Sequence, residues 1–174
     1  MAPPVNLVLI NPKRNSDFNE ESRILISRVA PVCIAYNFHL VLVDFGITQT
    51  PLEFSKEIAP STSIGNGGKK LVELSEKGKI KICDLPLPHN IGNKIICTYN
   101  PSGEKSINLK KLVEISTDKT IALVFGIEFR KNKYLKKVKK ESNIHFDITN
   151  KKIKLSLDSE IGAVCTSLFN FKKD

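Results

Sequence analysis

This sequence lacks several features that define whole classes of protein. It contains no tryptophan and only one methionine among 174 residues. Its longest apolar runs, such as residues 122–125, are far too short to cross a bilayer. Met1 leads directly into a short apolar run that stops at Asn11, which is not the pattern of a signal peptide. We therefore expect a cytoplasmic protein with no membrane partner.

Metal-ligating patterns are also missing from the sequence. The four cysteines form no Cys-x-x-Cys pair, and of the three histidines only His89 lies near a cysteine, Cys83. Because structural zinc sites need closely spaced cysteine and histidine ligands, the sequence predicts no bound metal. In a cytoplasmic protein the cysteines are then expected to be reduced and mostly buried.

What the sequence does contain is the composition of one globular domain. Hydrophobic residues make up 41% of the chain and charged residues 26%, a balance that argues against global disorder. The length of 174 residues is that of one ordinary domain. Because there is no linker, low-complexity block or internal repeat, we predict one domain over residues 1–174.

Positive charge is concentrated in the C-terminal part of the chain, and the formal net charge is +9. Residues 1–100 contain eleven Lys and Arg against nine Asp and Glu, whereas residues 101–174 contain sixteen against nine. Such a one-sided excess is typical of a protein that binds a polyanion such as RNA. Solubility or a thermophilic host is the alternative explanation for a lysine-rich surface.

Short apolar runs alternate with helical patterns along the chain. The run from Val5 to Ile10, which stops at Asn11, is typical of a buried parallel strand. The alternation predicts a three-layer α/β fold with a mostly parallel sheet, in which ligands bind beyond the carboxyl ends of the strands. The predicted strands are 5–10, 40–43, 80–84, 94–98, 120–125 and the edge strand 144–148, and the predicted helices are 17–37, 51–59, 69–77, 107–115, 133–140 and 160–171.

Local signals predict how some of these helices begin or bend. Asp17 and Glu20 have the spacing of a capping box, and Ser106 is a candidate cap for the helix that follows it. Pro31 predicts a kink or a division into two short helices. The Gly-Asn-Gly-Gly segment at 65–68 could hold a phosphate. It fits neither the P-loop nor the dinucleotide motif, so a mobile turn is the alternative.

A basic stripe is predicted on the helix at 133–140, within a stretch of seven basic residues from Arg130 to Lys140. At helical spacing, Tyr134, Leu135 and Val138 fall on the other side of this helix. The functional interpretation is phosphate contact with RNA, and the alternative is an ordinary solvated helix face. The stripe consists of Lys133, Lys136, Lys137 and Lys140.

Two C-terminal segments carry a resemblance to a known family. Residues 122–128 are an apolar strand that ends in Phe-Gly-x-Glu, and residues 154–164 contain a Ser-Leu-x-Ser loop that opens an apolar helix. The pair resembles the second and third signature motifs of the SPOUT (α/β-knot) superfamily of RNA methyltransferases. Asn11-Pro12 after the first strand is similar to the start of its ribose-methylating branch. The match is closest to a little-characterised archaeal group.

The resemblance implies a C-terminal trefoil knot, a homodimer, and S-adenosylmethionine bound within the knot mainly by backbone groups. Gly126 would let the backbone approach the ligand closely. Leu155, Leu157 and Ile161 would line an apolar slot for the adenine, and free N–H groups at the start of the last helix would bond to it. The implied cofactor-binding residues are Thr98, Tyr99, Asn100, Phe125, Gly126, Ile127, Glu128, Leu155, Ser156, Leu157 and Ile161.

The resemblance also implies candidate catalytic residues. Asp158 is the carboxylate beside the cofactor loop, and Arg14 or Arg130 would hold the target phosphate. Asp158 stands where the ribose-methylating branch has asparagine, and Phe129 stands where it has glycine. The alternatives are a helix cap for Asp158, a structural bond for Glu128 and plain surface charges for the two arginines.

Three functions from different classes follow from these observations. The leading interpretation is an S-adenosylmethionine-dependent RNA methyltransferase that acts on tRNA or rRNA, a reaction that needs an aligned acceptor and often a general base but no metal. The second is a knotted RNA-binding protein or ribosome factor without transfer activity. The third is an α/β domain that binds another nucleotide or anion and only mimics the motifs.

Overall fold

A six-stranded parallel sheet forms the centre of the computed structural model, which describes residues 2–13, 18–61 and 67–172. The strand order is β3-β2-β1-β5-β4-β6, and each pair of neighbouring strands runs parallel. The α/β class and the parallel sheet predicted from the apolar runs are therefore confirmed, and the trefoil knot stays a prediction. The strands are β1 Val5–Ile10, β2 His39–Val43, β3 Ile80–Cys83, β4 Asn93–Cys97, β5 Ile121–Phe125 and β6 Ile144–Phe146.

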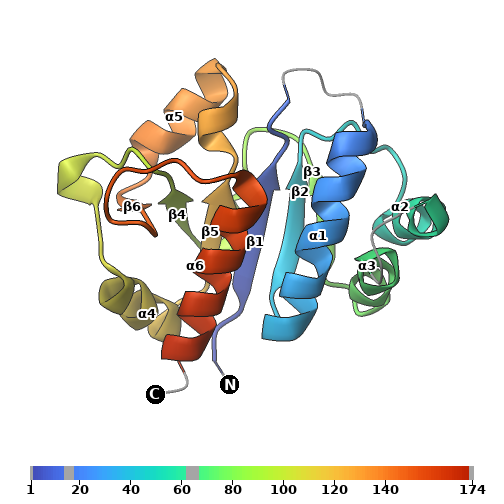
Figure 1. Cartoon of the computed structure of the whole chain (residues 1–174), viewed down its shortest axis with the longest axis horizontal. Coiled ribbons are helices and arrows are strands. Elements are labelled where there is room, and N and C mark those ends of the chain that lie inside the picture. Colours follow the sequence, from blue (N-terminus) through green and yellow to red (C-terminus); the bar gives the residue numbers. More distant parts are fainter. Residues whose placement is uncertain (1, 14–17, 62–66, 173–174) are drawn as a thin grey trace.

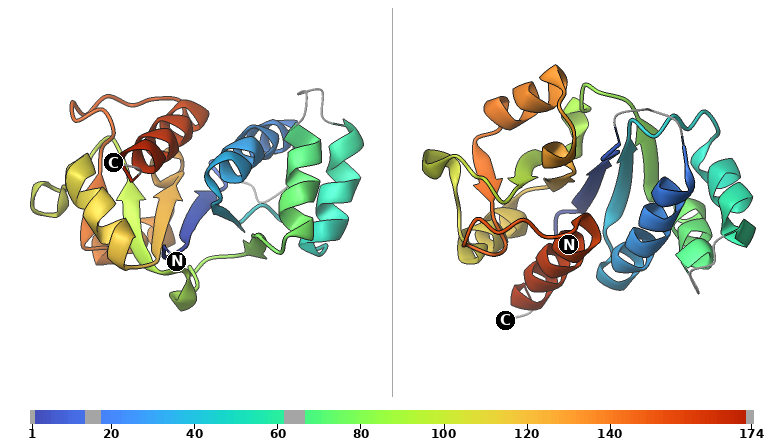
Figure 2. Two further views of the ribbon diagram at one scale, coloured as in Figure 1. Left: turned by 90° about the horizontal axis from the view of Figure 1, so that it is seen from below. Right: turned by 45° about the horizontal axis from the view of Figure 1, so that its top comes forward.

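Helices cover the two faces of the sheet unequally. On one face α1 and α6 lie side by side, with α3 and α2 beyond α1 and α4 next to α6 (Figure 1). Segment 84–92 lies on the other side of the sheet from these helices (Figure 2), and it covers that face together with α5. No helix in the described ranges is long and apolar enough to cross a membrane. The helices are α1 Glu20–Tyr36, α2 Pro51–Ile58, α3 Gly67–Glu76, α4 Leu109–Asp118, α5 Lys133–Glu141 and α6 Leu157–Phe171.

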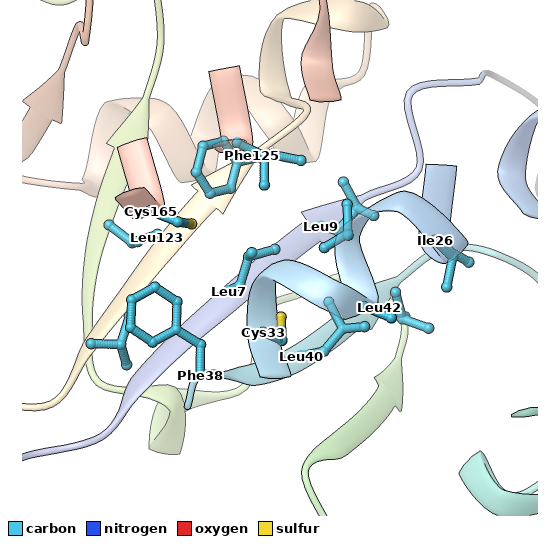
Figure 3. Close-up of a cluster of buried hydrophobic side chains, with 14 of the residues drawn as sticks. Leu7, Leu9, Ile26, Cys33, Phe38, Leu40, Leu42, Leu123, Phe125 and Cys165 are labelled. Atoms are coloured by element: carbon cyan, nitrogen blue, oxygen red, sulfur yellow. The ribbon is translucent and has the colours of Figure 1, made fainter. Parts of the chain in front are cut away.

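The hydrophobic core lies on both faces because alternate residues of a strand point in opposite directions. Leu7 and Leu9 of β1 belong to the large cluster under α1 and α6, which also contains Cys165 (Figure 3). Val8 and Ile10 belong to a smaller cluster with residues of segment 84–92 and α5. Strands that are buried on both faces read as nearly continuous apolar runs, which is why the sequence revealed them.

The cysteines are free thiols, as predicted, with three of them buried and Cys83 partly buried. Burial raises the pKa of the Cys33 thiol to about 12 and outweighs the opposing effect of nearby Lys79. A thiol of this kind stays protonated at neutral pH and is a poor nucleophile, so Cys33 contributes packing rather than chemistry.

The first helix, α1, continues through Pro31, so the predicted division into two short helices is wrong, while the alternative of a kink stays a prediction. Because Pro31 has no N–H, the carbonyl of Ser27 loses its helical partner. Gly67 of α3 packs against that carbonyl so closely that a Cβ there would lie 2.4 Å from the Ser27 oxygen. Contacts with α3 and α6 on its two sides thus support α1 across the proline.

Apart from α3, which begins at Gly67, two residues before its predicted start, three helix starts differ from those predicted. Asn19 caps α1 by accepting from the Ser22 N–H at 2.9 Å, and the proposed cap Asp17 lies outside the described residues. Asn108 rather than Ser106 caps α4, because its side chain accepts from the Lys111 N–H at 2.9 Å. The last helix begins at Leu157, three residues before the predicted start. The capping side chains of Asn19 and Asn108 set the starts of α1 and α4, and the extended residue Ser156 sets the start of α6.

Candidate functional site

The predicted cofactor segments meet at the carboxyl edge of the sheet. Since all strands are parallel, the loops after β1, β4, β5 and β6 emerge at this edge. The strand order changes direction between β1 and β5, and such switch points are where open α/β sheets bind ligands. Segments 98–100, 125–128 and 155–157 are thereby brought to one region of the molecule (Figure 1).

A hydrogen-bonded chain joins the loops after β4 and β5. The Thr98 hydroxyl donates to Glu128 Oε1 at 2.5 Å and accepts from the Asn100 N–H at 3.0 Å. Lys139 Nζ from α5 donates to the same Glu128 oxygen at 2.5 Å. Glu128 therefore fixes the positions of two of the three predicted cofactor segments.

Lys154 links the third segment to the other two. Its ammonium lies 4.5 Å from the centre of the Phe129 ring and 5.8 Å from the centre of the Tyr99 ring. A cation between two aromatic rings is attracted to both ring faces. Phe129 thus has a defined partner in the segment that leads into α6.

Gly126 lies in close contact with the protein's own backbone, and the predicted approach to a ligand stays a prediction. Its φ is +97°, and a Cβ at this position would lie 2.4 Å from the carbonyl oxygen of Ile10. Only glycine adopts this conformation without strain at such a contact. Gly126 therefore allows the end of β5 to pass over the end of β1.

Asp147 shapes the segment that returns from β6 to α6. One carboxylate oxygen accepts from the Thr149 N–H at 3.0 Å and from its hydroxyl at 2.7 Å. The other accepts from the Lys152 N–H at 2.8 Å. Asn150 and Lys152 both have positive φ, so this turn is tight and leads directly to the cofactor segment at 155–157.

Asp158 lies in the first turn of α6 and is ion-paired. Ser156, in an extended conformation, is the N-cap and makes no side-chain capping bond, so the helix-cap interpretation of Asp158 is wrong. Arg28 Nη1 of α1 donates to Asp158 at 3.0 Å. Partial burial opposes ionisation, but hydrogen bonds from Ser156 and the Ser159 N–H, together with Arg28, lower the pKa of Asp158 overall. Asp158 is therefore a carboxylate at neutral pH.

Arg130 is not a plain surface charge. Its guanidinium donates to Asp44 at 2.5 Å and to the Lys13 carbonyl at 3.3 Å, and only 6% of its side chain is exposed. Asp44 also accepts from the Leu85 N–H at 2.9 Å. The Nε atom of Arg130 is buried without a hydrogen-bond partner. Arg14, the other predicted phosphate ligand, lies outside the described residues.

A cavity of about 540 Å³ opens between the end of β1, the loop after β5 and the start of α6. Lys13, Arg130 and Lys131 supply its positive charge, and Leu25, Phe129 and Leu157 supply most of its apolar wall. Because all of its charged lining residues are basic, this cavity can accommodate an anionic group such as a phosphate, although Lys13 and Arg130 also pair with Glu21 and Asp44.

Glu160 stands out among the carboxyl groups of this region. Burial, followed by repulsion from the carboxylates of Asp147 and Glu128, raises the pKa of Glu160 to about 7. A carboxyl group with a pKa near neutrality can hold or release a proton under working conditions. In the sequence, Glu160 is only the predicted first residue of the last helix, because the carboxylates that raise its pKa belong to distant parts of the chain.

The remaining predicted residues divide into buried and exposed groups. Leu157 and Ile161 pack into the main core, Leu155 is partly exposed, and Phe125 and Ile127 are buried. On α5, the four lysines of the predicted stripe are all exposed. The prediction that Tyr134 and Leu135 lie on the side of α5 away from the lysines is confirmed only in part, because Leu135 is buried while Tyr134 is 49% exposed.

Four residues of the site were missed or given no role by the sequence analysis, namely Arg28, Asp44, Lys154 and Glu160. The only local signal was the position of Asp44 directly after a buried strand. The others lie at ordinary positions of helices or loops, and their partners are as far away as 130 residues in sequence.

The fold is shared with solved methyltransferase structures. An AdoMet-bound rRNA methyltransferase from Sinorhizobium meliloti superimposes with a TM-score of 0.55 at 10% identity, over 98% of this chain and 57% of the other. A probable methylase family protein from Haemophilus influenzae Rd KW20 gives a TM-score of 0.63 at 17% identity, over 99% of this chain and 68% of the other. The chain thus spans little more than half the length of the first of these structures.

A relative of nearly the same length exists in an archaeon. The uncharacterized protein MJ0224 of Methanocaldococcus jannaschii is 27% identical over 169 residues, which cover 97% of this chain and 95% of the relative. Over residues 5–169 the sequence also matches a family described as protein of unknown function (DUF531), and the chain belongs to that family.

Proposed function

We propose that this protein is an S-adenosylmethionine-dependent RNA methyltransferase that acts on tRNA or rRNA. The observation that carries the proposal is the meeting of segments 98–100, 125–128 and 155–157 at the switch point of the sheet. These segments were chosen from a resemblance in sequence, and the fold brings them together through Glu128 and Lys154. The shared fold with an AdoMet-bound rRNA methyltransferase supports the same assignment.

The charges near these segments suit the cofactor. S-adenosylmethionine carries a positive sulfonium, which supplies the methyl group. Glu160 lies close enough to Glu128 and Asp147 for their carboxylates to raise its pKa. A bound cation would offset that repulsion and favour the ionised form of Glu160. The first-turn N–H groups of α6, whose N-cap Ser156 makes no side-chain capping bond, would hold the adenine.

The acceptor would lie on the side of the basic cavity. Arg130, Lys13 and Lys131 would hold a phosphate of the RNA there. Asp158, kept ionised by its neighbours, would accept the proton that the methylated atom loses. Arg28 would position this carboxylate through the 3.0 Å ion pair. The proposal also includes a homodimer and a C-terminal trefoil knot, both implied by the family resemblance.

Calorimetric titration with S-adenosylmethionine and S-adenosylhomocysteine tests the cofactor site. We expect micromolar binding that Leu155→Arg abolishes by placing a charge in the apolar slot. Ile153→Arg is the matched control, because this side chain is 53% exposed and lies two residues earlier. A folded wild-type protein that binds neither ligand would contradict the proposal. Light scattering on the same sample would test the dimer.

Transfer of labelled methyl groups to total tRNA and rRNA tests the reaction itself. We expect incorporation by the wild type and a loss of about 10²-fold or more in Asp158→Asn, the range for removal of a general base. Cofactor affinity should be unchanged in this variant. If Asp158→Asn transfers methyl groups at the wild-type rate, Asp158 is not the base.

A second function, RNA binding without transfer, is favoured by one observation. Two of the predicted catalytic side chains already have protein partners, since Asp158 pairs with Arg28 and Arg130 with Asp44. Such pairs stabilise a fold whether or not chemistry occurs. RNA binding together with cofactor binding but no transfer to any cellular RNA would favour this alternative.

A further inference from the structure

A second cavity lies away from the carboxyl edge of the sheet. It has a volume of about 730 Å³ and is formed by the 86–94 segment, α5 and residues 142–144. Asn93 and Lys94, at the amino end of β4, line it, whereas the predicted cofactor loop follows the carboxyl end of the same strand. This groove is therefore separate from the proposed methyl-transfer site.

The walls of the groove are held in place by the fold. The Ser142 hydroxyl donates to the Lys94 carbonyl at 2.8 Å and so ties the end of α5 to β4. Gly92 has a φ of +96°, and a Cβ there would lie 2.5 Å from the Thr120 carbonyl oxygen. Leu87 is 5% exposed and forms part of the apolar floor. A cavity of this size with fixed walls is typical of a preformed ligand site.

The chemistry of the groove combines an exposed aromatic ring with positive charge. Tyr134 is 49% exposed, although its helix buries apolar side chains elsewhere. Lys133 Nζ lies 5.2 Å from the centre of its ring. Lys94 and Lys137 also line the groove, and its single lining carboxylate in the described residues, Glu141, pairs with Lys137 at 3.7 Å. Glu141 offsets one of the two lysine charges of the lining, so Lys94, together with Lys133 beside the ring, keeps the groove positive.

We propose that this groove binds an unpaired nucleotide of single-stranded RNA, with the base stacked on Tyr134 and the adjacent phosphates on Lys94 and Lys137. The inference rests on RNA being the partner in the proposed function. Aromatic stacking beside lysines that follow the backbone is the usual way in which proteins hold unpaired bases. A duplex cannot use the ring, because its bases are stacked inside the helix. The groove thus selects single-stranded loops or ends of an RNA, and the lysine stripe of α5 contacts the neighbouring phosphates.

Fluorescence anisotropy with a labelled ten-nucleotide oligo(U) and a sixteen-base-pair RNA duplex tests this assignment. We expect Tyr134→Ala to raise the Kd for oligo(U) by roughly 5- to 150-fold, the effect of losing one stacked base. Binding of the duplex should be unchanged, and Tyr134→Phe should retain wild-type affinity for oligo(U). Phe171→Ala removes an aromatic side chain that is 57% exposed at the end of α6, and it is the matched control.

The salt dependence of oligo(U) binding tests the role of the lysines. Lys94→Ala and Lys137→Ala should each lower the slope of log K against log salt by about 0.7 for single strands. Equal affinity of Tyr134→Ala and wild type for oligo(U), with all proteins folded, would overturn the assignment, as would a parallel loss of duplex binding. Titration of Tyr134→Ala with S-adenosylmethionine separates the two proposals, because the cofactor site should be intact. If the wild-type protein binds oligo(U) through Tyr134 but does not bind S-adenosylmethionine, the groove assignment holds and the methyltransferase proposal fails.

Discussion

Charged residues of the carboxyl edge differ from those of α5 in what they contact. At the edge, Arg130 pairs with Asp44 and Asp158 pairs with Arg28, within a network that also fixes loops. On α5 the lysine stripe is exposed, and Lys137 makes only a loose ion pair with Glu141, at 3.7 Å. In the sequence, Arg130 and the lysines of α5 look alike, because all of them belong to the basic stretch from Arg130 to Lys140. A charged side chain that faces an opposite charge from a distant element stabilises the fold, whereas one that faces solvent is available to a binding partner.

The largest expected effect comes from the buried ion pair of the edge. Asp44→Asn keeps a side chain able to accept from the Leu85 N–H but leaves the Arg130 guanidinium, 6% exposed, without its counter-charge. Breaking such a pair costs about 3–5 kcal/mol. We expect denaturant unfolding to show a loss of this size. In Asp44→Asn/Arg130→Met, which removes both charges, most of the stability should return.

A substitution in an exposed ion pair of α5 is the matched control for Asp44→Asn. Glu141→Gln breaks the pair with Lys137, in which both side chains are about two thirds exposed (65% and 69%). Exposed pairs contribute little, so the free energy of unfolding should change by no more than about 0.5 kcal/mol. Equal losses in Asp44→Asn and Glu141→Gln would show that the two regions do not differ.

The next effect concerns the backbone at the switch point. Gly126→Ala places a Cβ 2.4 Å from the Ile10 carbonyl oxygen at a φ of +97°. We expect a loss of about 1–3 kcal/mol in the free energy of unfolding, the range for a strained backbone position. Gly162→Ala is the control, since nothing lies within 4 Å of a Cβ in that part of α6. This helical substitution should raise stability by about 0.5–1 kcal/mol, and a loss there would contradict the packing described.

A smaller effect should depend on pH through Glu160. Its pKa is raised to about 7 in the folded protein, so between about 4.5 and 7 the folded state holds a proton that the unfolded state has released. Stability from this group is therefore complete below about 4.5 and is lost as the pH rises through 7. Because the carboxyl is partly exposed and screened, Glu160→Gln should gain only about 1–2 kcal/mol at pH 8 relative to wild type. Unfolding curves at pH 4.5 and 8 measure the difference, and a constant difference would contradict the raised pKa.

The smallest effect on stability should come from the lysine stripe, although its effect on binding is large. Lys136→Ala and Lys140→Ala should each change the free energy of unfolding by less than about 0.5 kcal/mol. Each should also reduce the salt dependence of single-stranded RNA binding by about 0.7 of slope. Lys56→Ala on α2, another exposed lysine, is the control and should leave the slope unchanged. Identical slopes in all variants would mean that the stripe is only a solvated face.

The strands and the carboxyl edge of the sheet could be predicted from the sequence for a physical reason. Parallel strands that are buried on both faces, such as β1 and β5, must be apolar throughout, and that pattern is visible without a structure. Polar loops between apolar runs then mark the carboxyl edge. Helix starts were less accurate, because Asn19 and Asn108 compete with nearby serine and aspartate for the same role.

The sequence alone thus determined the α/β class, the order of the elements and the segments that gather at the carboxyl edge. Only the tertiary structure decided that α1 passes through Pro31, that Gly126 serves the packing of β5 on β1, and which charges have partners. Local periodicity encodes burial within one element, whereas an ion pair depends on where two distant elements meet. Asp44 and Arg130 are 86 residues apart, and Arg28 and Asp158 are 130 apart. Their pairing follows from the order of the strands and the packing of α1 against α6, which no short window of sequence contains.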